Sequence, residues 1–259
     1  ETFPATTTKR LAFKSVASEL LWMIEGSSDE RRLAEILYGN RDPKNKTIWT
    51  ANAEAEYWKP KASFPGDLGR VYGVQWRSWY YADREKVHMY SGDFLYQRDR
   101  HKYKDQLAEL IENIKEDPES RRHILTAWNP TELNQMALPP CHMIAQFDVS
   151  HGQLSCQLYQ RSCDMFLGVP FNIASYSLLT CMIAQVCNLK PREFIWTGGD
   201  CHIYYNHMDA VMEQMSREPS QLPTLELTRD ITDIDKFTMN DIKLVNYNPQ
   251  PTIKAPMAV

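Results

Sequence analysis

The chain has 259 residues, of which 43% are hydrophobic and 24% charged, and its formal net charge is −4. This length fits one large domain or two small ones with a sizeable core, and the lack of a basic excess argues against a protein that coats nucleic acid. Because no stretch of about 18 apolar residues occurs, the sequence predicts no membrane-spanning segment.

Helical and irregular segments alternate in the first half of the chain. "KSVASELLWMIEG", residues 14–26, has apolar residues at helical spacing and ends in a glycine suited to a C-cap. Residues 37–65 and 83–101 lose apolar periodicity and gather polar residues, so we interpret both as long loops or insertions. "KDQLAELIENIKED", residues 104–117, predicts an amphipathic helix that Pro118 ends.

Strands dominate the middle of the chain. "RRHILTAW", residues 121–128, predicts a strand, and residues 142–162 predict two more strands joined by a turn at His151 and Gly152. An apolar, central helix is expected over residues 172–187, a strand over 193–199 and a polar-faced helix over 206–218. Adjacent strands with separate helices favour an α+β fold over a repeated βαβ pattern.

The six cysteines do not form a CxxC pair, which argues against a structural zinc site. Reduced, mostly buried thiols in a cytosolic compartment are the simplest interpretation, and core positions are expected for Cys156, Cys163, Cys181 and Cys187. Cys201, between an aspartate and a histidine, is harder to place. Cys141 follows two prolines that stiffen a corner before a predicted strand. A buried filler, a metal ligand and a nucleophile are its three possible roles.

Several polar residues have both a simple and a functional interpretation. The arginines of "SRR", residues 120–122, and "YQRS", residues 159–162, fit exposed solubilising charge, but guanidinium groups together also bind phosphate, and one beside a thiol lowers its pKa. His202 fits either a satisfied buried histidine or a ligand for a hydroxyl group. Asn172 fits either a helix N-cap or an amide that faces a base.

The linked runs "ALPPCH", "LSCQLYQRSCDMFLGVPFNIASY" and "WTGGDCHIYYNH" strongly resemble the thymidylate synthase family. So do "FPATTTKR", "GDLGRVYGVQWR", "DPESRRHILTAWNP" and "IKAPMAV", in the same order over nearly the whole chain. The resemblance implies one catalytic domain over residues 1–259, with a bent mixed β-sheet packed with helices. It also implies a homodimer, paired through the sheet, with shared active sites. The family converts dUMP to dTMP with 5,10-methylenetetrahydrofolate as co-substrate and uses no metal.

The resemblance assigns roles on the nucleotide side of the site. Cys141 matches the nucleophile that adds to C6 of the pyrimidine. Glu19 and Tyr72 match groups that order water for proton transfer. Asn172 matches the asparagine that reads the base, since one amide complements the N3–H donor and the O4 acceptor of uracil. Arg161 and Ser162 match phosphate ligands, and Arg161 is also suited to thiolate activation. Arg121 and Arg122 match the pair that reaches the phosphate from the other subunit. His202 and Tyr204 match the residues that hold the deoxyribose hydroxyl.

On the folate side, Asp164 matches the pterin ligand and Lys9 is expected to meet the glutamate tail. The C-terminal Ala258 and Val259 match the end that closes over the bound substrates as a lid. The apolar wall of the folate site is expected from Ile48, Trp49, Leu138, Leu167 and Phe171.

Three features depart from the family pattern. The Arg-Thr-Gly phosphate loop upstream of the "FP" pair is absent, so either the sequence is truncated or one phosphate arginine has been lost. Thr50 stands where many relatives have aspartate, and Arg70 where many have proline. A pyrimidine-nucleotide hydroxymethylase of the same family, in which water replaces hydride, and a non-catalytic nucleotide-binding homologue are the alternatives to a synthase.

Overall fold

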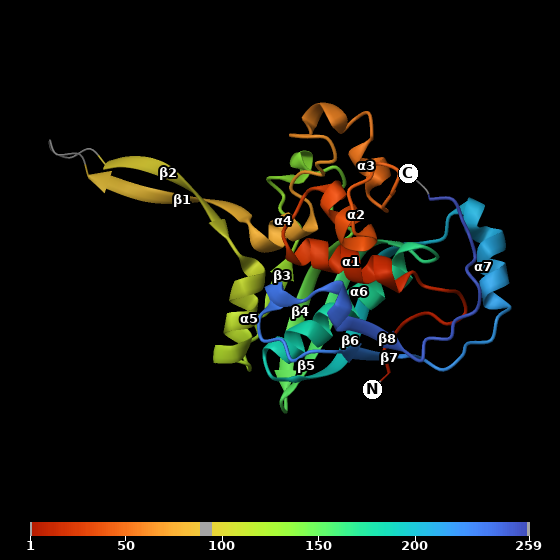
Figure 1. The fold of residues 1–259 in the computed structure, drawn as a ribbon. Coiled ribbons are helices and arrows are strands. Elements are labelled where there is room, and N and C mark those ends of the chain that lie inside the picture. Colours follow the sequence, from red (N-terminus) through yellow and green to blue (C-terminus); the bar gives the residue numbers. More distant parts are fainter. Residues whose placement is uncertain (1, 89–94, 258–259) are drawn as a thin grey trace.

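A four-stranded mixed sheet with strand order β3-β4-β5-β6 lies at the centre of the protein (Figure 1). The computed structural model describes residues 2–88 and 95–257, with the backbone alone over 83–88 and 95–101. Antiparallel pairing joins β3 (Ile124–Thr126) to β4 (His142–Ser150) and β4 to β5 (Gln153–Asp164), whereas β6 (Lys190–His202) runs parallel to β5. The expected α+β class with a mixed sheet is therefore confirmed.

The turn between β4 and β5 lies where the sequence predicts it. His151 and Gly152 have positive φ values of 52° and 72°, which suit a two-residue hairpin turn. Register shifts in β4 between His142 and Ile144, and in β5 between Leu154 and Cys156, interrupt the regular ladder. Irregularities of this kind bend a strand and increase its twist, which accounts for the bent sheet.

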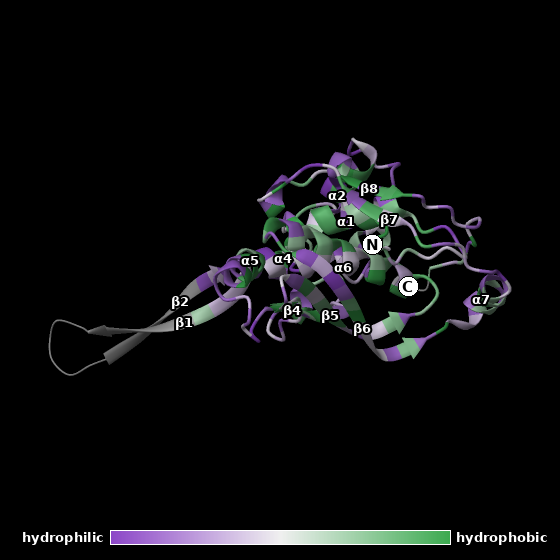
Figure 2. Cartoon of the chain, turned by 90° about the horizontal axis from the view of Figure 1, so that it is seen from below, coloured by the Kyte–Doolittle hydropathy of each residue, from purple (hydrophilic) through white to green (hydrophobic). Residues whose placement is uncertain are grey.

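The long helix α6 (Gly168–Val186) connects β5 to β6 and packs against both strands on one side and against α1 (Phe13–Ile24) on the other. It lies in the interior of the molecule (Figure 2). Among the described residues it is the one helix long and apolar enough to cross a membrane, and 67% of its most apolar window is buried inside the protein. This is the pattern of the central core helix that the sequence predicts.

The remaining helices surround this core. α1 ends at Ile24, and Gly26 follows with a φ of 68°, as the predicted glycine stop requires. α5 (Gln106–Glu116) and α7 (Met208–Met215) lie within their predicted ranges. Two helices were not predicted from the sequence, α2 (Glu30–Tyr38) and α4 (Tyr72–Arg77). The small antiparallel sheet of β7 (Thr224–Leu227) and β8 (Ile242–Val245) was not predicted either.

The expected loop over residues 83–101 was wrong, because most of this range belongs to a β-hairpin. β1 (Trp79–His88) and β2 (Leu95–Lys104) pair antiparallel from Trp79 opposite Lys104 to His88 opposite Leu95, and residues 89–94 lie outside the described part of the chain. The ribbon projects from the body of the protein (Figures 1 and 2). A projecting ribbon has no core face to impose apolar alternation, so the usual strand signal is absent.

Residues 37–65 are irregular as expected, but they are anchored rather than a free loop. The segment includes the end of α2, the short α3 (Thr50–Ala53) and a 3₁₀ turn over Lys59–Lys61. The indoles of Trp49 and Trp58 are buried, and Trp58 Nε1 donates to the carbonyl of Asp67 at 2.7 Å. Trp49 and Trp58 therefore anchor this segment to the core, although its mostly polar composition predicts a free loop.

Arg70, the departure from proline, forms an ion pair with the buried carboxylate of Glu132, with 2.8 Å between Nε and Oε1. The other oxygen of Glu132 accepts hydrogen bonds from the amides of Gln75 at 2.8 Å and Asn129 at 3.1 Å. An arginine at this position therefore places a positive charge beside a buried carboxylate, which a proline could not do.

Candidate active site

Cys141 lies directly before β4, at the corner that the two prolines form. Its backbone N–H donates to the hydroxyl of Tyr72 at 2.8 Å, and its carbonyl accepts the backbone N–H of Arg161 at 2.8 Å. The guanidinium of Arg161 donates to the carbonyls of Pro140 and Pro139, both at 2.9 Å. Prolines lack a backbone donor, but their carbonyls remain acceptors, and here they anchor the arginine beside the cysteine.

Opposing effects act on the half-buried thiol of Cys141. Burial is the largest and raises its pKa, while the charge of Arg161 and hydrogen bonds with Tyr72 and Ser162 act to lower it. The net pKa is raised. The expected influence of Arg161 is present in direction, but in the free protein it does not outweigh burial.

Glu19, on α1, is the second titratable group of the site. Trp49 Nε1 donates to its Oε1 at 2.6 Å. Burial raises the pKa of Glu19 to about 6, and the hydrogen bond from the indole limits that rise. The ring of Tyr72, at the start of α4, lies 5.7 Å from that of Trp49, so the structure brings these predicted residues together around Cys141.

His142 and Tyr176 belong to the same cluster, although neither was predicted as a site residue from the sequence. The imidazole of His142 stacks on Tyr72, with 4.1 Å between ring centroids, and its Nδ1 lies 2.8 Å from the hydroxyl of Tyr176. Burial lowers the pKa of His142 to about 3, so the ring is neutral at physiological pH. The feature of the sequence that could have indicated His142 as a site residue is its position directly after Cys141.

Asn172 is the fifth residue of α6, whose N-cap is Leu167, so the N-cap interpretation was wrong. Its Oδ1 accepts a hydrogen bond from Nε2 of Gln160 at 3.0 Å, and Oε1 of Gln160 accepts one from the indole of Trp196 at 3.1 Å. Gln160 is 2% exposed. A chain of three side chains from β6, β5 and α6 thus orients the Asn172 amide, and Gln160 and Trp196 were missed.

The other predicted nucleotide ligands fall into two groups. Ser162 lies beside Cys141, and β6 ends at His202, whose ring centroid lies 5.0 Å from that of Tyr204. Arg121 and Arg122 are exposed and precede β3, at the end of the β3–β4 pair remote from Cys141, since His123 pairs with Phe147. One chain therefore does not bring Arg122 and Arg161 together.

The predicted folate residues differ in exposure. Trp49 is buried, Leu138, Leu167 and Phe171 are half-buried, and Ile48 is 54% exposed. Oδ1 of Asp164 accepts the backbone N–H groups of Phe166 at 3.0 Å and Leu167 at 3.1 Å, so this carboxylate also shapes the turn into α6. Ala258 and Val259 lie outside the described residues.

Lys9 does not reach an open surface. Its ammonium group donates to the backbone carbonyl of Phe166 at 2.5 Å and lies 3.3 Å from the centroid of the Phe166 phenyl ring. Burial lowers its pKa to about 8, against the influence of Asp164. The role of Lys9 at a glutamate tail stays a prediction, and this conformation directs its charge inward.

The expected core thiols are only partly confirmed, because Cys156 and Cys163 are buried whereas Cys181 and Cys187 are half-buried and Cys201 is exposed. Within the described ranges, no group of three or more His, Cys, Asp and Glu side chains could hold a metal ion. Titratable groups with shifted pKa values gather instead around one cysteine, as they do in enzyme active sites.

Comparison with known proteins places this fold and site in the folate-dependent methyltransferase class. The thymidylate synthase family model matches residues 1–259. The thymidylate synthase of Herpesvirus ateles is 49% identical over 260 residues, covering 99% of this chain and 84% of that protein. The thymidylate synthase of Coxiella burnetii (strain RSA 493 / Nine Mile phase I) is 48% identical over 259 residues, covering 100% of this chain and 85% of that protein. The chain belongs to the thymidylate synthase family.

Proposed function

We propose that this protein catalyses the reductive methylation of dUMP by 5,10-methylenetetrahydrofolate, with dTMP and dihydrofolate as products. The observation that carries the proposal is Cys141, held at a proline corner between Tyr72 and Arg161 in a chain that matches the family from end to end. Both relatives described above bear the synthase name, which favours the synthase over the hydroxymethylase. No observation favours the non-catalytic homologue.

Cys141 is the proposed nucleophile. Its sulfur adds to C6 of the pyrimidine and makes C5 nucleophilic, a step that uracil needs because its C5 is unreactive by itself. Arg161, Tyr72 and Ser162 favour the thiolate, as their effects on the pKa of Cys141 indicate. Glu19 and Tyr72 are the proposed groups for ordering the water that carries protons to and from the base.

Asn172 is the proposed base-reading residue, and Gln160 supports that role by holding its Oδ1. Uracil presents a donor at N3 and an acceptor at O4, and one amide complements both. His202 and Tyr204 are proposed to bind the deoxyribose hydroxyl, and Arg161 and Ser162 the phosphate.

The residues at the proposed folate site fit such a ligand. Half-buried Leu138, Leu167 and Phe171 leave apolar surface available, and Asp164 offers a carboxylate beside it. The folate supplies the one-carbon unit and the hydride when bound. Apolar side chains around the buried indole of Trp49 would exclude water from the reacting carbon, which favours a methyl over a hydroxymethyl product.

A homodimer paired through the sheet, in the cytosol, is part of the proposal. Four large side chains, Ile124, Ile144, Tyr159 and Ile195, are each 37–45% exposed, and the strand register places them on one face of the sheet. Covering such a face is a common reason for self-association. Arg121 and Arg122 would then be available to the phosphate site of the partner.

The test of the nucleophile is Cys141→Ala. We expect this variant to lose turnover and to bind dUMP nearly as well as the wild type. A fluorinated dUMP analogue with folate should form a covalent adduct with the wild type and none with Cys141→Ala. Near-normal turnover in the variant would refute the assignment, and Cys201→Ala, which removes an exposed thiol, is the matched control.

A further inference from the structure

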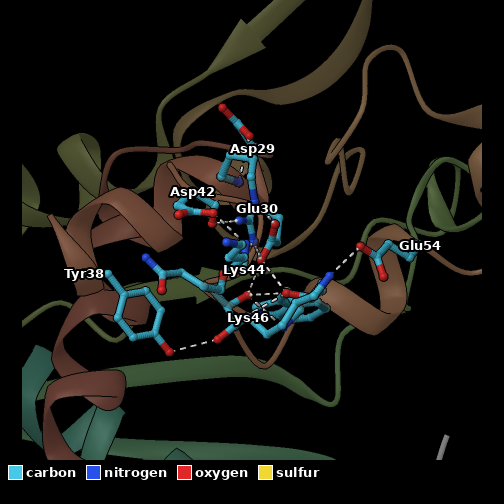
Figure 3. A network of polar contacts seen from close by, with 12 residues as sticks. Asp29, Glu30, Tyr38, Asp42, Lys44, Lys46 and Glu54 are labelled. Atoms are coloured by element: carbon cyan, nitrogen blue, oxygen red, sulfur yellow. Dashed lines mark hydrogen bonds and ion pairs between the residues drawn. The ribbon is translucent and has the colours of Figure 1, made fainter. Parts of the chain in front are cut away.

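Glu30, the first residue of α2, is a buried carboxylate to which the proposed reaction assigns no role. It is 2% exposed and belongs to a network of polar contacts (Figure 3). Its Oε1 accepts hydrogen bonds from the hydroxyls of Thr47 and Thr50, each at 2.6 Å. Arg31 donates to both carboxylate oxygens, at 2.5 and 2.6 Å. Burial acts to raise the pKa of Glu30, but the hydrogen bonds from Arg31, Thr47 and Thr50 outweigh it and the net pKa is lowered.

The two threonines are the ends of a four-residue turn. Thr50 Oγ1 accepts the backbone N–H of Thr47 at 2.8 Å while its hydroxyl donates to Glu30. Thr47 Oγ1 accepts the backbone N–H of Trp49 at 3.2 Å. One carboxylate therefore holds both ends of the turn that carries Trp49.

Trp49 connects this turn to Glu19. The residue is 7% exposed, and its ring centroid lies 6.1 Å from that of Trp22 and 5.7 Å from that of Tyr72. From there its N–H reaches the Glu19 carboxylate at 2.6 Å. A hydrogen bond this short depends on where the turn places the indole.

We propose that Glu30 is a positioning residue: by holding Thr47 and Thr50 it keeps the Trp49 indole on the Glu19 carboxylate. Thr50 stands where many relatives have an aspartate. In this protein the carboxylate at that place comes from Glu30 on α2, which accepts a hydrogen bond from the hydroxyl of Thr50. The consequence for turnover rests on the proposed function of Glu19, whereas the placement of the indole does not.

The direction of the expected change separates positioning from simple electrostatics. Loss of the indole hydrogen bond raises the pKa of Glu19, because that bond favours the ionised carboxylate. Removal of the negative charge of Glu30 would by itself lower the same pKa. The two effects have opposite signs.

Other titratable groups near Glu19 do not complicate the measurement. Tyr72 from α4 and Tyr176 from α6 have pKa values raised well above their ordinary value, mainly by burial. His142 from β4, which contacts both rings, has a pKa of about 3. Cys141 has a raised pKa as well. Across the range in which Glu19 titrates, these neighbours stay neutral.

The test is an NMR titration of the Trp49 indole N–H in protein labelled at tryptophan, with Trp49→Phe to assign the signal. From about pH 5 to about pH 8 the indole proton should report the ionisation of Glu19. In Glu30→Gln we expect the inflection to move to higher pH and the indole proton to move to a less hydrogen-bonded chemical shift. Glu54→Gln is the matched control, since Glu54 follows α3 but pairs with Lys46 at the surface (Figure 3). An inflection in Glu30→Gln that stays in place or moves to lower pH would overturn the proposal.

Two further variants keep the test decisive if Glu30→Gln does not fold. Thr50→Val removes one hydroxyl, leaves Glu30 paired with Arg31, and should move the inflection in the same direction. Glu30→Ala combined with Thr50→Asp should restore the wild-type titration, because a carboxylate at position 50 can reach the backbone N–H of Thr47. An unmoved inflection in Thr50→Val would overturn the proposal, as would a double variant that resembles Glu30→Ala alone.

Turnover provides a separate readout. If ionised Glu19 is required, kcat of Glu30→Gln at the acidic end of the range should fall about fivefold further than that of the wild type. A moved NMR inflection with an unchanged kcat profile would support the positioning role of Glu30 and count against the proposed function of Glu19.

Discussion

Replacing Arg161 with methionine tests how one guanidinium organises the site. Arg161 donates two side-chain hydrogen bonds, to the carbonyls of Pro139 and Pro140, and its Cζ lies 5.4 Å from the ring centroid of Trp128. Methionine retains an unbranched apolar stem but makes neither hydrogen bond and carries no charge. The proline corner therefore loses its anchor, and Cys141 loses its neighbouring cation.

The magnitude follows from these contacts. A buried hydrogen bond from a charged donor contributes roughly 1.5–3 kcal/mol, and because Arg161 is only half-buried we use the lower end of this range. The free energy of unfolding of Arg161→Met should then be about 2–3 kcal/mol lower than that of the wild type. Burial already raises the pKa of Cys141, and losing the opposing charge of Arg161 raises it further. Alkylation of this thiol at about pH 8 should slow by about tenfold.

Urea unfolding measures the first effect, and mass spectrometry of the peptide that contains Cys141 during alkylation measures the second. Arg161→Lys is the matched control, since lysine keeps the charge but cannot donate to both carbonyls in the same planar geometry. It should lose stability and retain most of the alkylation rate. Alkylation of Cys141 in Arg161→Met at the wild-type rate would refute the idea that the guanidinium acts on the thiol.

Three further predictions concern base choice, assembly and pH. Asn172→Asp should improve the kcat/KM for dCMP relative to dUMP, and an unchanged ratio would remove Asn172 from base recognition. Mixing Cys141→Ala with Arg122→Ala should restore activity, because both lesions fall in one site of the heterodimer and the other site is intact. Mixing Cys141→Ala with Arg161→Ala should not, because each site then carries one lesion. Recovery in neither mixture would argue against donation of Arg122 across the dimer. The pKa of His142 is about 3 against an ordinary value of 6.5, so below pH 6.5 the unfolded chain binds a proton that the folded chain does not, and stability falls. This contribution lowers the free energy of unfolding by up to about 1.4 kcal/mol per pH unit, and it should disappear in His142→Gln. An equal dependence of the free energy of unfolding on pH in both proteins would contradict the burial of a neutral imidazole.

The local pattern of apolar and turn-forming residues was sufficient to predict the helix and the strands that form the core. α6 is apolar around most of its circumference, and the turn at His151 and Gly152 separates two runs of strand-forming residues, so both could be predicted. The proline corner identified Cys141 as unusual. It did not indicate that the carbonyls of Pro139 and Pro140 accept hydrogen bonds from the guanidinium of Arg161 on β5.

Contacts between distant elements could not be predicted from local pattern. Gln160 acts on Asn172 only because β5 and α6 meet, and nothing in the residues around either position indicates that contact. Glu30 and Thr50 lie on separate elements, so a buried carboxylate that compensates for a threonine is visible only in three dimensions. Lys9 was expected to meet the glutamate tail of the folate, and its contacts with the carbonyl and the ring of Phe166 could not be predicted from the residues around it.

The hairpin of β1 and β2 shows another limit. Its backbone register places Asp83 opposite Arg100 and Arg84 opposite Asp99, so residue types of opposite charge occupy paired positions. In the sequence those charges were interpreted as the polarity of a loop. Which positions lie opposite each other in a hairpin can be derived from the sequence only when the position of the turn is known.

The measurement that tests the central claim most directly is the product formed from dUMP and 5,10-methylenetetrahydrofolate. Mass spectrometry of the nucleotide and the absorbance of dihydrofolate can be followed in the same reaction, with Cys141→Ala as the control. We expect dTMP and dihydrofolate in equal amounts and neither product from the variant. A hydroxymethyl nucleotide without dihydrofolate, or no nucleotide product from the wild type, would contradict the assignment of this protein as a thymidylate synthase.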